Sequence, residues 1–358
     1  MAVLPNGVRP GSPTASAERR SQLALDAAMR RASARLGVSE AAVAMAVSAA
    51  MTFGITALTF VLGYPLAALA AKARAATVAA SPEGLWLQPF WAAVVRGPRL
   101  APYTASPLFP GLLSMAYYVL ACAPLAALDV LDFGWVNRRF KLQADKPGGW
   151  ARQGAWLQTL GLTARHHVLC IAPGLALQLA LRGPWMYAQP MCLISCDGQD
   201  LFPEAAPAVA ELAAHVLLCL VVMDAAYHLW HRWHHLTPLL YKHVHSVHHE
   251  FHAPFVWVTQ YEHALELLAV SAFTMCVPMA LGCHPLSQWA WMLTAVQVSI
   301  DAHSGYDFVG LSKVLPVWGG PLHHDDHHKY PRTNFQPFFT WFDWALGTHC
   351  SLSVAKGS

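Results

Sequence analysis

The stretch Asp224-Ala-Ala-Tyr-His-Leu-Trp-His-Arg-Trp-His-His235 closes an apolar segment at about 207–227 with a cluster of histidines. Two more clusters, His245-Ser-Val-His-His249 and His324-Asp-Asp-His-His328, also follow apolar stretches, and sixteen of the 20 histidines lie between His228 and His328. Each imidazole brings two ring nitrogens that need partners, so packing alone explains this density poorly. Imidazole is a ligand that suits Fe, Zn and Cu. The clusters therefore predict a transition-metal site.

The composition of the chain predicts an integral membrane protein. Of its 358 residues 55% are hydrophobic and 12% are charged, whereas soluble domains carry about 25% charged residues. The net charge of +3 is too small to suggest nucleic acid as a partner. The eight cysteines show no C-x-x-C pair, so they do not indicate a disulfide scaffold.

The apolar segments predict an all-α fold with about four transmembrane helices and a short hairpin. A helix needs about 20 apolar residues to cross a bilayer, and four segments meet that length: 41–71, 111–131, 158–181 and 207–227. A pair at 264–282 and 286–301, joined by a Gly-Cys-His-Pro turn, is expected to span or dip into the membrane. Lysines and arginines in 132–157 and after 228 favour a cytosolic N-terminus and a cytosolic helical cap that carries the histidine clusters; the basic loop 72–110 agrees less well.

The chain divides into four predicted regions. They are a basic, flexible N-terminal tail at 1–40, a transmembrane region with a cytosolic loop at 41–157, a catalytic domain at 158–350 and a tail at 351–358. The arginines of 1–40 leave two interpretations open, an organellar transit peptide or a basic tail on the cytosolic side of the membrane. The endoplasmic reticulum is the expected location, and a plastid stays open.

Helical spacing predicts that the clusters converge. In an α-helix residues three, four and seven apart share a face, which aligns Asp224, His228, His231 and His235 and turns His234 away. The same spacing aligns 245, 248, 249 and 252 until Pro254 stops the helix, and 324, 327 and 328 with His323 turned away. Eight or more imidazoles exceed the four ligands of a structural zinc and suit two metal ions. Isolated histidines at 166, 167, 215, 284 and 349 are interpreted as packed core residues.

These clusters resemble the fatty acid hydroxylase / sterol desaturase superfamily of membrane di-iron oxygenases. The resemblance covers about residues 150–350 and extends beyond the clusters to Gln260–Glu266, Asp301–Phe308, Gly319–His328, the pair Asn334-Phe335 and Thr340–Thr348. The stretches His-His-Glu-Phe-x-Ala-Pro-Phe and His-Ser-Gly-Tyr-Asp-Phe look closest to C-4 methylsterol oxidase and cholesterol 25-hydroxylase-like members.

The resemblance implies two non-haem iron ions and nine histidine ligands: His231, His235, His245, His248, His249, His303, His324, His327 and His328. It leaves open whether His263 binds iron or supports the ligands. His228 departs from the family, which usually has an aromatic residue there, and is not expected to bind metal. Four acids are expected to orient ligand imidazoles through the nitrogen that faces away from the metal, namely Asp224, Glu266, Asp301 and Asp307.

The predicted function is hydroxylation of a lipid C–H bond with O2, because an unactivated C–H bond needs a stronger oxidant than any side chain supplies. A sterol oxidised at a C-4 methyl group is the first expectation; fatty acyl or carotenoid hydroxylation or desaturation is the alternative. No dinucleotide or haem motif occurs, so electrons are expected from a separate donor such as cytochrome b5 and its reductase. An alternative outside this class is a non-catalytic, histidine-rich metal-binding or transport protein. A metal transporter should carry acidic residues in the middle of its membrane helices to form an ion path, and the apolar segments carry few. The absence of H-E-x-x-H excludes a zinc protease of that type.

Overall fold

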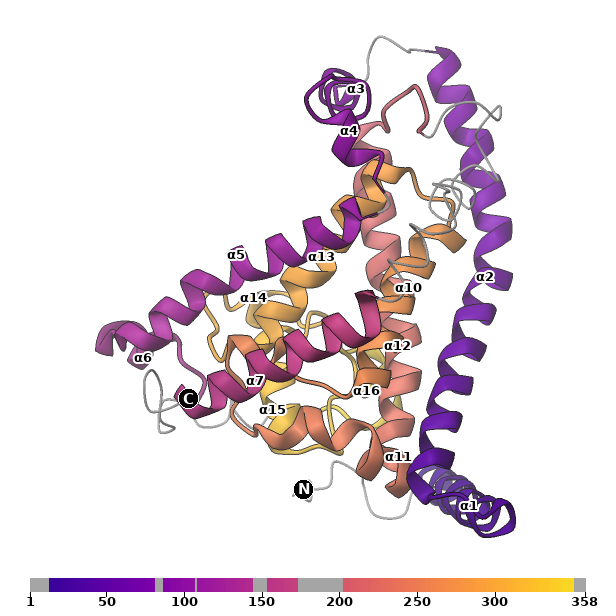
Figure 1. The fold of residues 1–358 in the computed structure, drawn as a ribbon, viewed down its shortest axis with the longest axis vertical. Coiled ribbons are helices and arrows are strands. Elements are labelled where there is room, and N and C mark those ends of the chain that lie inside the picture. Colours follow the sequence, from indigo (N-terminus) through magenta and orange to yellow (C-terminus); the bar gives the residue numbers. More distant parts are fainter. Residues whose placement is uncertain (1–12, 81–85, 107, 144–152, 173–201, 351–358) are drawn as a thin grey trace.

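The computed structural model describes residues 13–80, 86–106, 108–143, 153–172 and 202–350. Within these ranges the chain is helical, and the only strand-like contacts are two isolated bridges, Lys141 with Tyr306 and Trp318 with Phe339 (Figure 1). The prediction of an all-α integral membrane protein is confirmed.

In the part of the chain that the structure describes, three helices are long and apolar enough to cross a membrane. They are the Glu40–Ala68 part of α2 (Glu40–Ala80), α5 (Phe109–Leu131) and α10 (Val209–Leu236). The fourth predicted crossing, at 158–181, is covered only in part by α7 (Gln153–His166) and the π-helical turn η3 (His167–Ile171), and its residues 173–181 lie outside the described ranges. The last predicted span is longer than its apolar segment, because α10 continues through the histidine cluster to Leu236.

The predicted hairpin consists of α12 (Ala264–Ala280) and α13 (Pro285–His303). Gly282 lies in the turn with a φ of 64°, a left-handed conformation that glycine adopts without a steric penalty. His263 and His284 cap the two helices, since the Nδ1 of each accepts a hydrogen bond from the backbone N–H two residues later, 3.2 Å from Leu265 N and 3.1 Å from Leu286 N.

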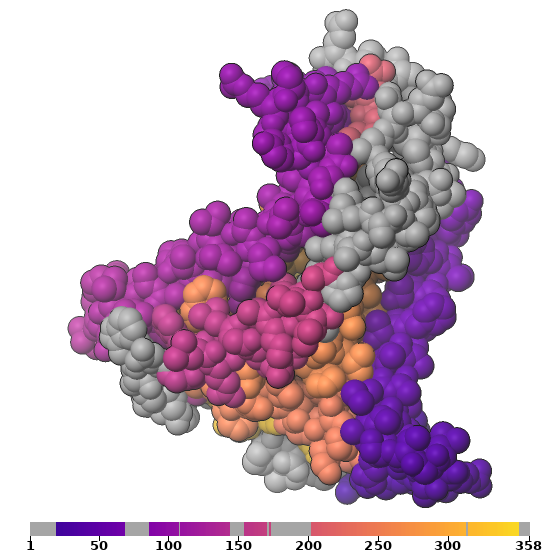
Figure 2. Space-filling model, viewed as in Figure 1, coloured from indigo at the N-terminus to yellow at the C-terminus, as the bar shows by residue number. Residues whose placement is uncertain are grey.

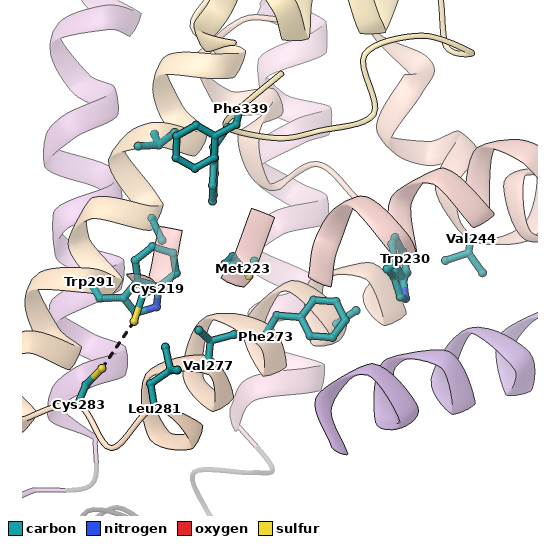
Figure 3. Packing of buried hydrophobic residues seen from close by; sticks show 14 residues of the cluster. Cys219, Met223, Trp230, Val244, Phe273, Val277, Leu281, Cys283, Trp291 and Phe339 are labelled. Carbon is teal, nitrogen blue, oxygen red and sulfur yellow. Dashed lines mark hydrogen bonds between the residues drawn. The ribbon is translucent and has the colours of Figure 1, made fainter. Parts of the chain in front are cut away.

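The main core lies between α10, α12 and α13. Cys219, Met223 and Trp230 from α10 pack against residues of the hairpin that include Phe273 and Trp291 (Figure 3). The helix α2 runs along one edge of the molecule and packs against α12, while α5 packs on α13 and α7 on η5 (Val256–Gln260) (Figures 1 and 2). The long helix α10 is thereby fixed on several sides before it reaches its histidines.

Short elements gather at the histidine-bearing end of α10. They are α11 (Pro238–His243), η4 (His245–Glu250), α15 (Gly320–Lys329) and α16 (Trp341–Leu346). The second cluster was expected on an α-helix, and this is wrong, because η4 is a 3₁₀-helix of six residues. The tighter 3₁₀ turn suits a short segment, and it leaves His252 beyond the helix end, where its Nδ1 donates to the carbonyl of His328 (3.2 Å).

The remaining elements lie at the periphery. They are α1 (Pro13–Leu36), α3 (Gln88–Val95), α4 (Ala101–Thr104), α6 (Gly134–Phe140) and α14 (Leu311–Val314). Helix α1 occupies residues that the sequence assigned to a flexible tail. It forms because an apolar stripe with Met29 packs against α2 and α11, and Figure 1 shows it at the end of α2 that is nearest α11.

Close packing between α2 and α12 depends on Gly63. A Cβ atom at this position would lie 2.7 Å from the carbonyl oxygen of Ala280, closer than carbon and oxygen can approach, whereas a Cβ at Gly54 in the same helix would meet nothing within 4 Å. Small residues that let backbones approach are the usual means of helix association in membranes. Gly63 therefore sets the distance between α2 and the hairpin.

Substitution Gly63→Ala should separate α2 from α12 and lower the free energy of unfolding by about 1–3 kcal/mol, the usual cost of overpacking. The matched substitution Gly54→Ala should leave stability unchanged or raise it by up to about 1 kcal/mol, because alanine is the better helix former. Unfolding of both variants in detergent, followed by circular dichroism, measures the difference. Equal stability of the two variants would contradict the proposed contact.

Candidate metal centre

Nine buried histidines form two adjacent groups. We name the first group site A; it contains His231, His235, His245, His249 and His327. The second group, site B, contains His248, His303, His324 and His328. Within each group one nitrogen of every ring lies within 4.8 Å of the corresponding nitrogens of the others. The nine are the residues that the sequence predicts as ligands, and the structure brings all of them together.

Four elements supply the rings, and two of them serve both sites. Helix α10 gives His231 and His235, one turn apart, to site A, and α13 gives its last residue, His303, to site B. The turn η4 and helix α15 each contribute to both sites, because neighbouring residues such as His327 and His328 point to different groups. The sites are consequently in contact, with the rings of His249 and His328 centred 4.7 Å apart.

Main-chain carbonyls fix the orientation of five of these rings through Nδ1. The acceptors lie 2.6–3.2 Å away and are Phe335 for His231, Thr333 for His327, Tyr261 for His248, Ser299 for His303 and Phe251 for His328. A carbonyl oxygen can only accept, so Nδ1 carries the proton in each case. A neutral ring then presents a bare lone pair at Nε2. All five Nε2 atoms thus belong to the inner faces of the two sites.

Burial keeps the rings neutral. It lowers the pKa of His245, His248, His249, His324 and His328 well below the ordinary value, and that of His327 to about 3. Neighbouring histidines lower the pKa of these rings further, since a second positive charge in the same group is unfavourable.

The inner nitrogens are arranged in a way that hydrogen bonding does not explain. The Nε2 atoms of His248 and His303 lie 3.1 Å apart, although both rings already carry their proton on Nδ1. Two lone pairs at this distance repel unless a cation lies between them. Nitrogens bound at about 2.1 Å to one ion and roughly at right angles have this spacing. The donor set therefore fits metal ions, one at each site.

A segment near the C-terminus supplies two of the carbonyls, and we name residues Thr333–Phe339 the carbonyl loop. Asn334 lies between Thr333 and Phe335, whose carbonyls accept from the rings. It has a left-handed conformation with a φ of 55°, which asparagine tolerates better than most residues. Its side chain bonds the carbonyls of His323 and Cys350 and the N–H of Cys350. The loop is thus tied to α15 and to the last described residues.

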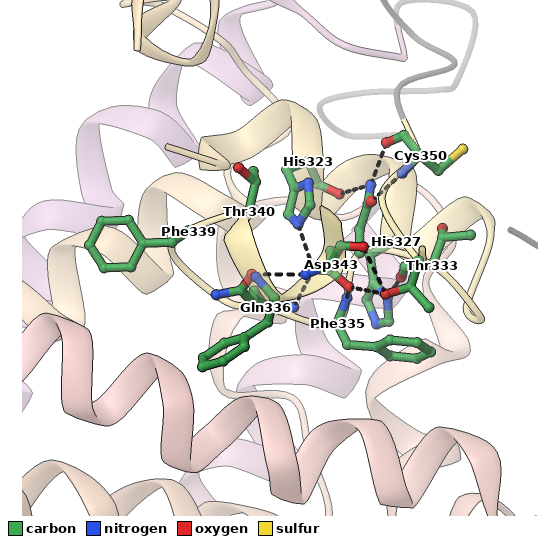
Figure 4. A network of polar contacts seen from close by, with 12 residues as sticks. His323, His327, Thr333, Phe335, Gln336, Phe339, Thr340, Asp343 and Cys350 are labelled. Carbon is green, nitrogen blue, oxygen red and sulfur yellow. Dashed lines mark hydrogen bonds and ion pairs between the residues drawn. The ribbon is translucent and has the colours of Figure 1, made fainter. Parts of the chain in front are cut away.

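Two buried carboxylates from different helices hold the carbonyl loop, and we name the pair the clamp. Asp224 of α10 accepts from the N–H groups of Phe338 and Phe339 at 2.9 and 3.0 Å and from the side-chain amide of Gln336. Asp343 of α16 accepts from the N–H groups of Phe335 and Gln336, both at 2.9 Å (Figure 4). The position of the loop, and with it the orientation of His231 and His327, depends on both acids.

Asp343 stays ionised in spite of its burial. Burial alone would raise the pKa of this carboxyl, but His323, Thr348 and the Gln336 N–H donate to it and hold its pKa below the usual range. The charge-assisted hydrogen bonds are stronger than neutral ones, so Asp343 is well suited to hold the loop.

A third carboxylate contacts site A directly. Glu266 Oε1, at the start of α12, lies 2.8 Å from His245 Nδ1, and the Tyr227 hydroxyl donates to the same oxygen at 3.1 Å. Both Glu266 and His245 are fully buried. Of the four acids expected to orient ligand imidazoles, Glu266 is the one seen in contact with a ring of site A or B.

The other three acids act differently from the expectation. Asp224 orients His231 only indirectly, through the carbonyl loop. Asp301 is exposed and accepts from Gln297, because the last turn of α13 directs it away from the rings. Asp307 accepts from the Gly310 N–H in a turn after α13.

The remaining histidines lie outside both sites. His263 caps α12, as described above, and His228 stacks on Phe342. His234 is turned towards α2, where it contacts Ser48 Oγ at 3.0 Å, and His323 donates to Asp343. Of the histidines that the sequence assigns to the packed core, His215 contacts Ser287 Oγ and His167 contacts the Thr163 carbonyl.

Sequence reasoning missed the residues of the carbonyl loop and its clamp, Asn334, Gln336 and Asp343. Asn334 lies in the Asn-Phe pair and Asp343 in the Thr340–Thr348 stretch, both of which resemble the family, so a signal for these two residues is present. Gln336 lies in neither stretch and has no such signal.

Comparison with known proteins agrees with this architecture. The family model described as fatty acid hydroxylase matches residues 216–348, which include all nine histidines and the carbonyl loop. No solved structure matches the chain.

Several curated proteins are similar over most of their length. Cholesterol 25-hydroxylase-like protein 2 of Danio rerio is 36% identical over 73% of this chain and 88% of that protein. Cholesterol 25-hydroxylase of Homo sapiens is 35% identical over 75% of this chain and 93% of its own length. Methylsterol monooxygenase 2-2 of Arabidopsis thaliana is 33% identical over 54% of this chain and 73% of that protein. The chain therefore belongs to the fatty acid hydroxylase family and is an oxidoreductase.

Proposed function

We propose that sites A and B bind two iron ions and that the enzyme uses O2 to hydroxylate a C–H bond of a sterol. The observation that carries the proposal is the convergence of nine neutral imidazoles whose lone pairs face one another in two adjacent groups. We assign the nine rings as ligands, five to one ion and four to the other.

The ligand set suits oxidative chemistry better than structural metal binding. Nine nitrogens exceed what tetrahedral zinc requires, and neutral ligands leave the full charge of the ions available. Iron at these sites would supply the activation of O2 that no side chain provides. The residues around it exclude water, since all nine rings are buried, and the carbonyl loop and Glu266 hold the ring planes in place.

The reaction also needs reducing equivalents. Hydroxylation of R–H to R–OH consumes O2, two electrons and two protons and releases one water. The sequence has no motif for a nicotinamide, flavin or haem group, so we propose a separate donor such as cytochrome b5 with its reductase. We further propose that the sites face the cytosol from the endoplasmic reticulum membrane, in line with the distribution of lysines and arginines.

A sterol is proposed as substrate because the relatives are named for cholesterol and methylsterols. The position of attack is a narrower question. Oxidation of a C-4 methyl group stays a prediction, and the names of the cholesterol 25-hydroxylase relatives support attack on the sterol side chain instead. A lipid reaches the sites from the bilayer, since the site A residues His231 and His235 end the apolar helix α10.

The iron content of the purified protein tests whether sites A and B bind two iron ions. The native protein should carry about two iron atoms per chain, and His248→Ala should remove a site B ligand, lower the iron content and abolish turnover while membrane insertion persists. The variant His263→Asn is the control, because asparagine also caps helices and His263 lies outside both sites; its iron content should equal the native value. Elemental analysis of purified protein measures this, and a native chain without iron would refute the assignment.

The role of the carbonyl loop can be tested with Asp343→Asn. The amide replaces one accepting oxygen by a donor that faces other donors, so the loop should loosen and the affinity for iron should fall by about 10–100-fold, as for other residues that support metal ligands. Iron retention against a chelator measures the effect. Asp301→Asn, at an acid whose side chain accepts from Gln297, should retain iron like the native chain. Equal retention by all three proteins would contradict a role for the clamp.

Substrate identity can be tested in membranes that contain the expressed chain. Supplied separately with cholesterol, a 4-methylsterol and a long-chain fatty acid, they should yield a product that is heavier by one oxygen atom from a sterol, as measured by mass spectrometry with ¹⁸O2. The fragmentation pattern distinguishes side-chain from C-4 methyl oxidation. If the label appeared in the fatty acid alone, the proposed hydroxylation would stand and the proposed sterol substrate would be wrong.

A further inference from the structure

Helix α1 presents two distinct faces. Gln22, Asp26 and Met29 are buried, and their spacing places them on one side of the helix. Arg20, Arg31 and Arg35 are exposed and fall on the opposite side. Among the residues that the structure describes, none of these three arginines has an ion-pair partner, whereas Arg30 is bound by Asp26 at 2.9 Å and Glu40 at 2.6 Å. The outward face therefore carries three uncompensated positive charges.

The C-terminal end of α1 lies close to the start of a membrane-spanning helix. It ends at Leu36, and the span in α2 begins at Glu40. Four residues cover at most about 14 Å, so the end of α1 cannot lie far from the boundary of the bilayer. Leu23, at the border of the arginine face, is 54% exposed, and Leu36 at the end of the helix is 71% exposed. Arginines with interspersed apolar side chains are typical of helices that lie in the headgroup region.

The buried face connects α1 to the metal centre. Met29 packs with Val43, Leu239 and Leu240, and Asp26 Oδ1 accepts from the Leu239 N–H at 3.0 Å. Leu239 lies in the first turn of α11, where Thr237 makes no side-chain cap, so Asp26 performs the capping role from another helix. Helix α11 joins His235 to His245, two members of site A. The position of α1 thus bears on the segment between two of these rings.

From these observations we propose that α1 is a binding surface for anionic lipid headgroups, with Arg20, Arg31 and Arg35 as the contacting charges. A juxtamembrane basic helix is attracted to an anionic leaflet by about 1 kcal/mol per charge, or about fivefold for each arginine. Lipid bound on the outer face would support α1 from the side opposite α11. The proposal concerns the membrane surface and does not depend on the reaction or on bound metal.

Lipid selectivity at α1 provides the test. The full-length protein, with an environment-sensitive fluorescent amino acid at the exposed Ala24, is reconstituted in phosphatidylcholine that contains equal fractions of quencher-labelled phosphatidylserine or quencher-labelled phosphatidylcholine. The ratio of quenching gives the relative association of the two lipids beside α1. We expect phosphatidylserine to be favoured by about fivefold or more, and the preference to fall towards one in 0.5 M NaCl, where the Debye length is roughly 4 Å.

Three variants separate specific from general effects. Arg31→Gln with Arg35→Gln should lower the ratio at least twofold and leave only the preference due to Arg20. The charge-preserving Arg31→Lys with Arg35→Lys should retain the native preference, which shows that the folded helix is intact. Arg138→Gln with Arg139→Gln removes the same charge from the exposed surface of α6 and should leave the ratio at α1 unchanged. A ratio near one in the native chain overturns the proposal and would assign the arginine face to an acidic protein instead; an equal loss in the α6 variant also overturns it.

Discussion

The structure depends on one requirement, that nine imidazoles be buried together without charge. A protonated ring in either site would place a cation beside several others at low dielectric, so each ring must be neutral and its proton must be on the outer nitrogen. Main-chain carbonyls meet this requirement at five rings. A carbonyl oxygen accepts a hydrogen bond but cannot donate one, so these groups fix both the tautomer of the ring and the direction of its lone pair. The inward lone pairs are what a metal ion then stabilises.

Much of the surrounding fold serves to place those carbonyls. They come from the carbonyl loop, from Phe251 and Tyr261, which directly follow η4 and η5, and from the end of α13. These segments are distant in sequence. The core between α10 and the hairpin fixes α13 relative to α10. Asp224 ties the carbonyl loop to α10, and Asp343, labelled in Figure 4, ties it to α16. Asp224 therefore lies deep in an apolar helix for a structural reason. The free-energy cost of burying the Asp224 carboxylate is offset by three hydrogen bonds, from the Gln336 side chain and from the N–H groups of Phe338 and Phe339.

The sequence predicts the rings better than it predicts what holds them. Periodicity places His231 and His235 on one stripe of α10 because a long helix enforces its own geometry, and the prediction that His234 and His323 turn away is confirmed. The expectation of an α-helix at 245–252 is wrong, because the six residues of η4, between a short helix and Pro254, adopt a 3₁₀ turn that helical spacing does not predict. Helical spacing also fails for Asp301, because which acid reaches a ring is decided by tertiary packing rather than by distance along the chain. The carbonyls of Thr333 and Phe335 have no signal in residue type at all, since every residue carries one.

Sites A and B are not structurally independent, because η4 and α15 each supply histidines to both. His245 and His249 belong to site A while His248, in the same turn, belongs to site B, and α15 divides His327 from His324 and His328 in the same way. A short 3₁₀ turn cannot shift one of these rings without moving its neighbours. Loss of one histidine ring from either site should therefore disturb the geometry of the other site, so the two sites form one structural unit. The carbonyl loop reinforces this coupling, because it orients His327 directly and is tied through Asn334 to the carbonyl of His323, in the same helix as the site B rings.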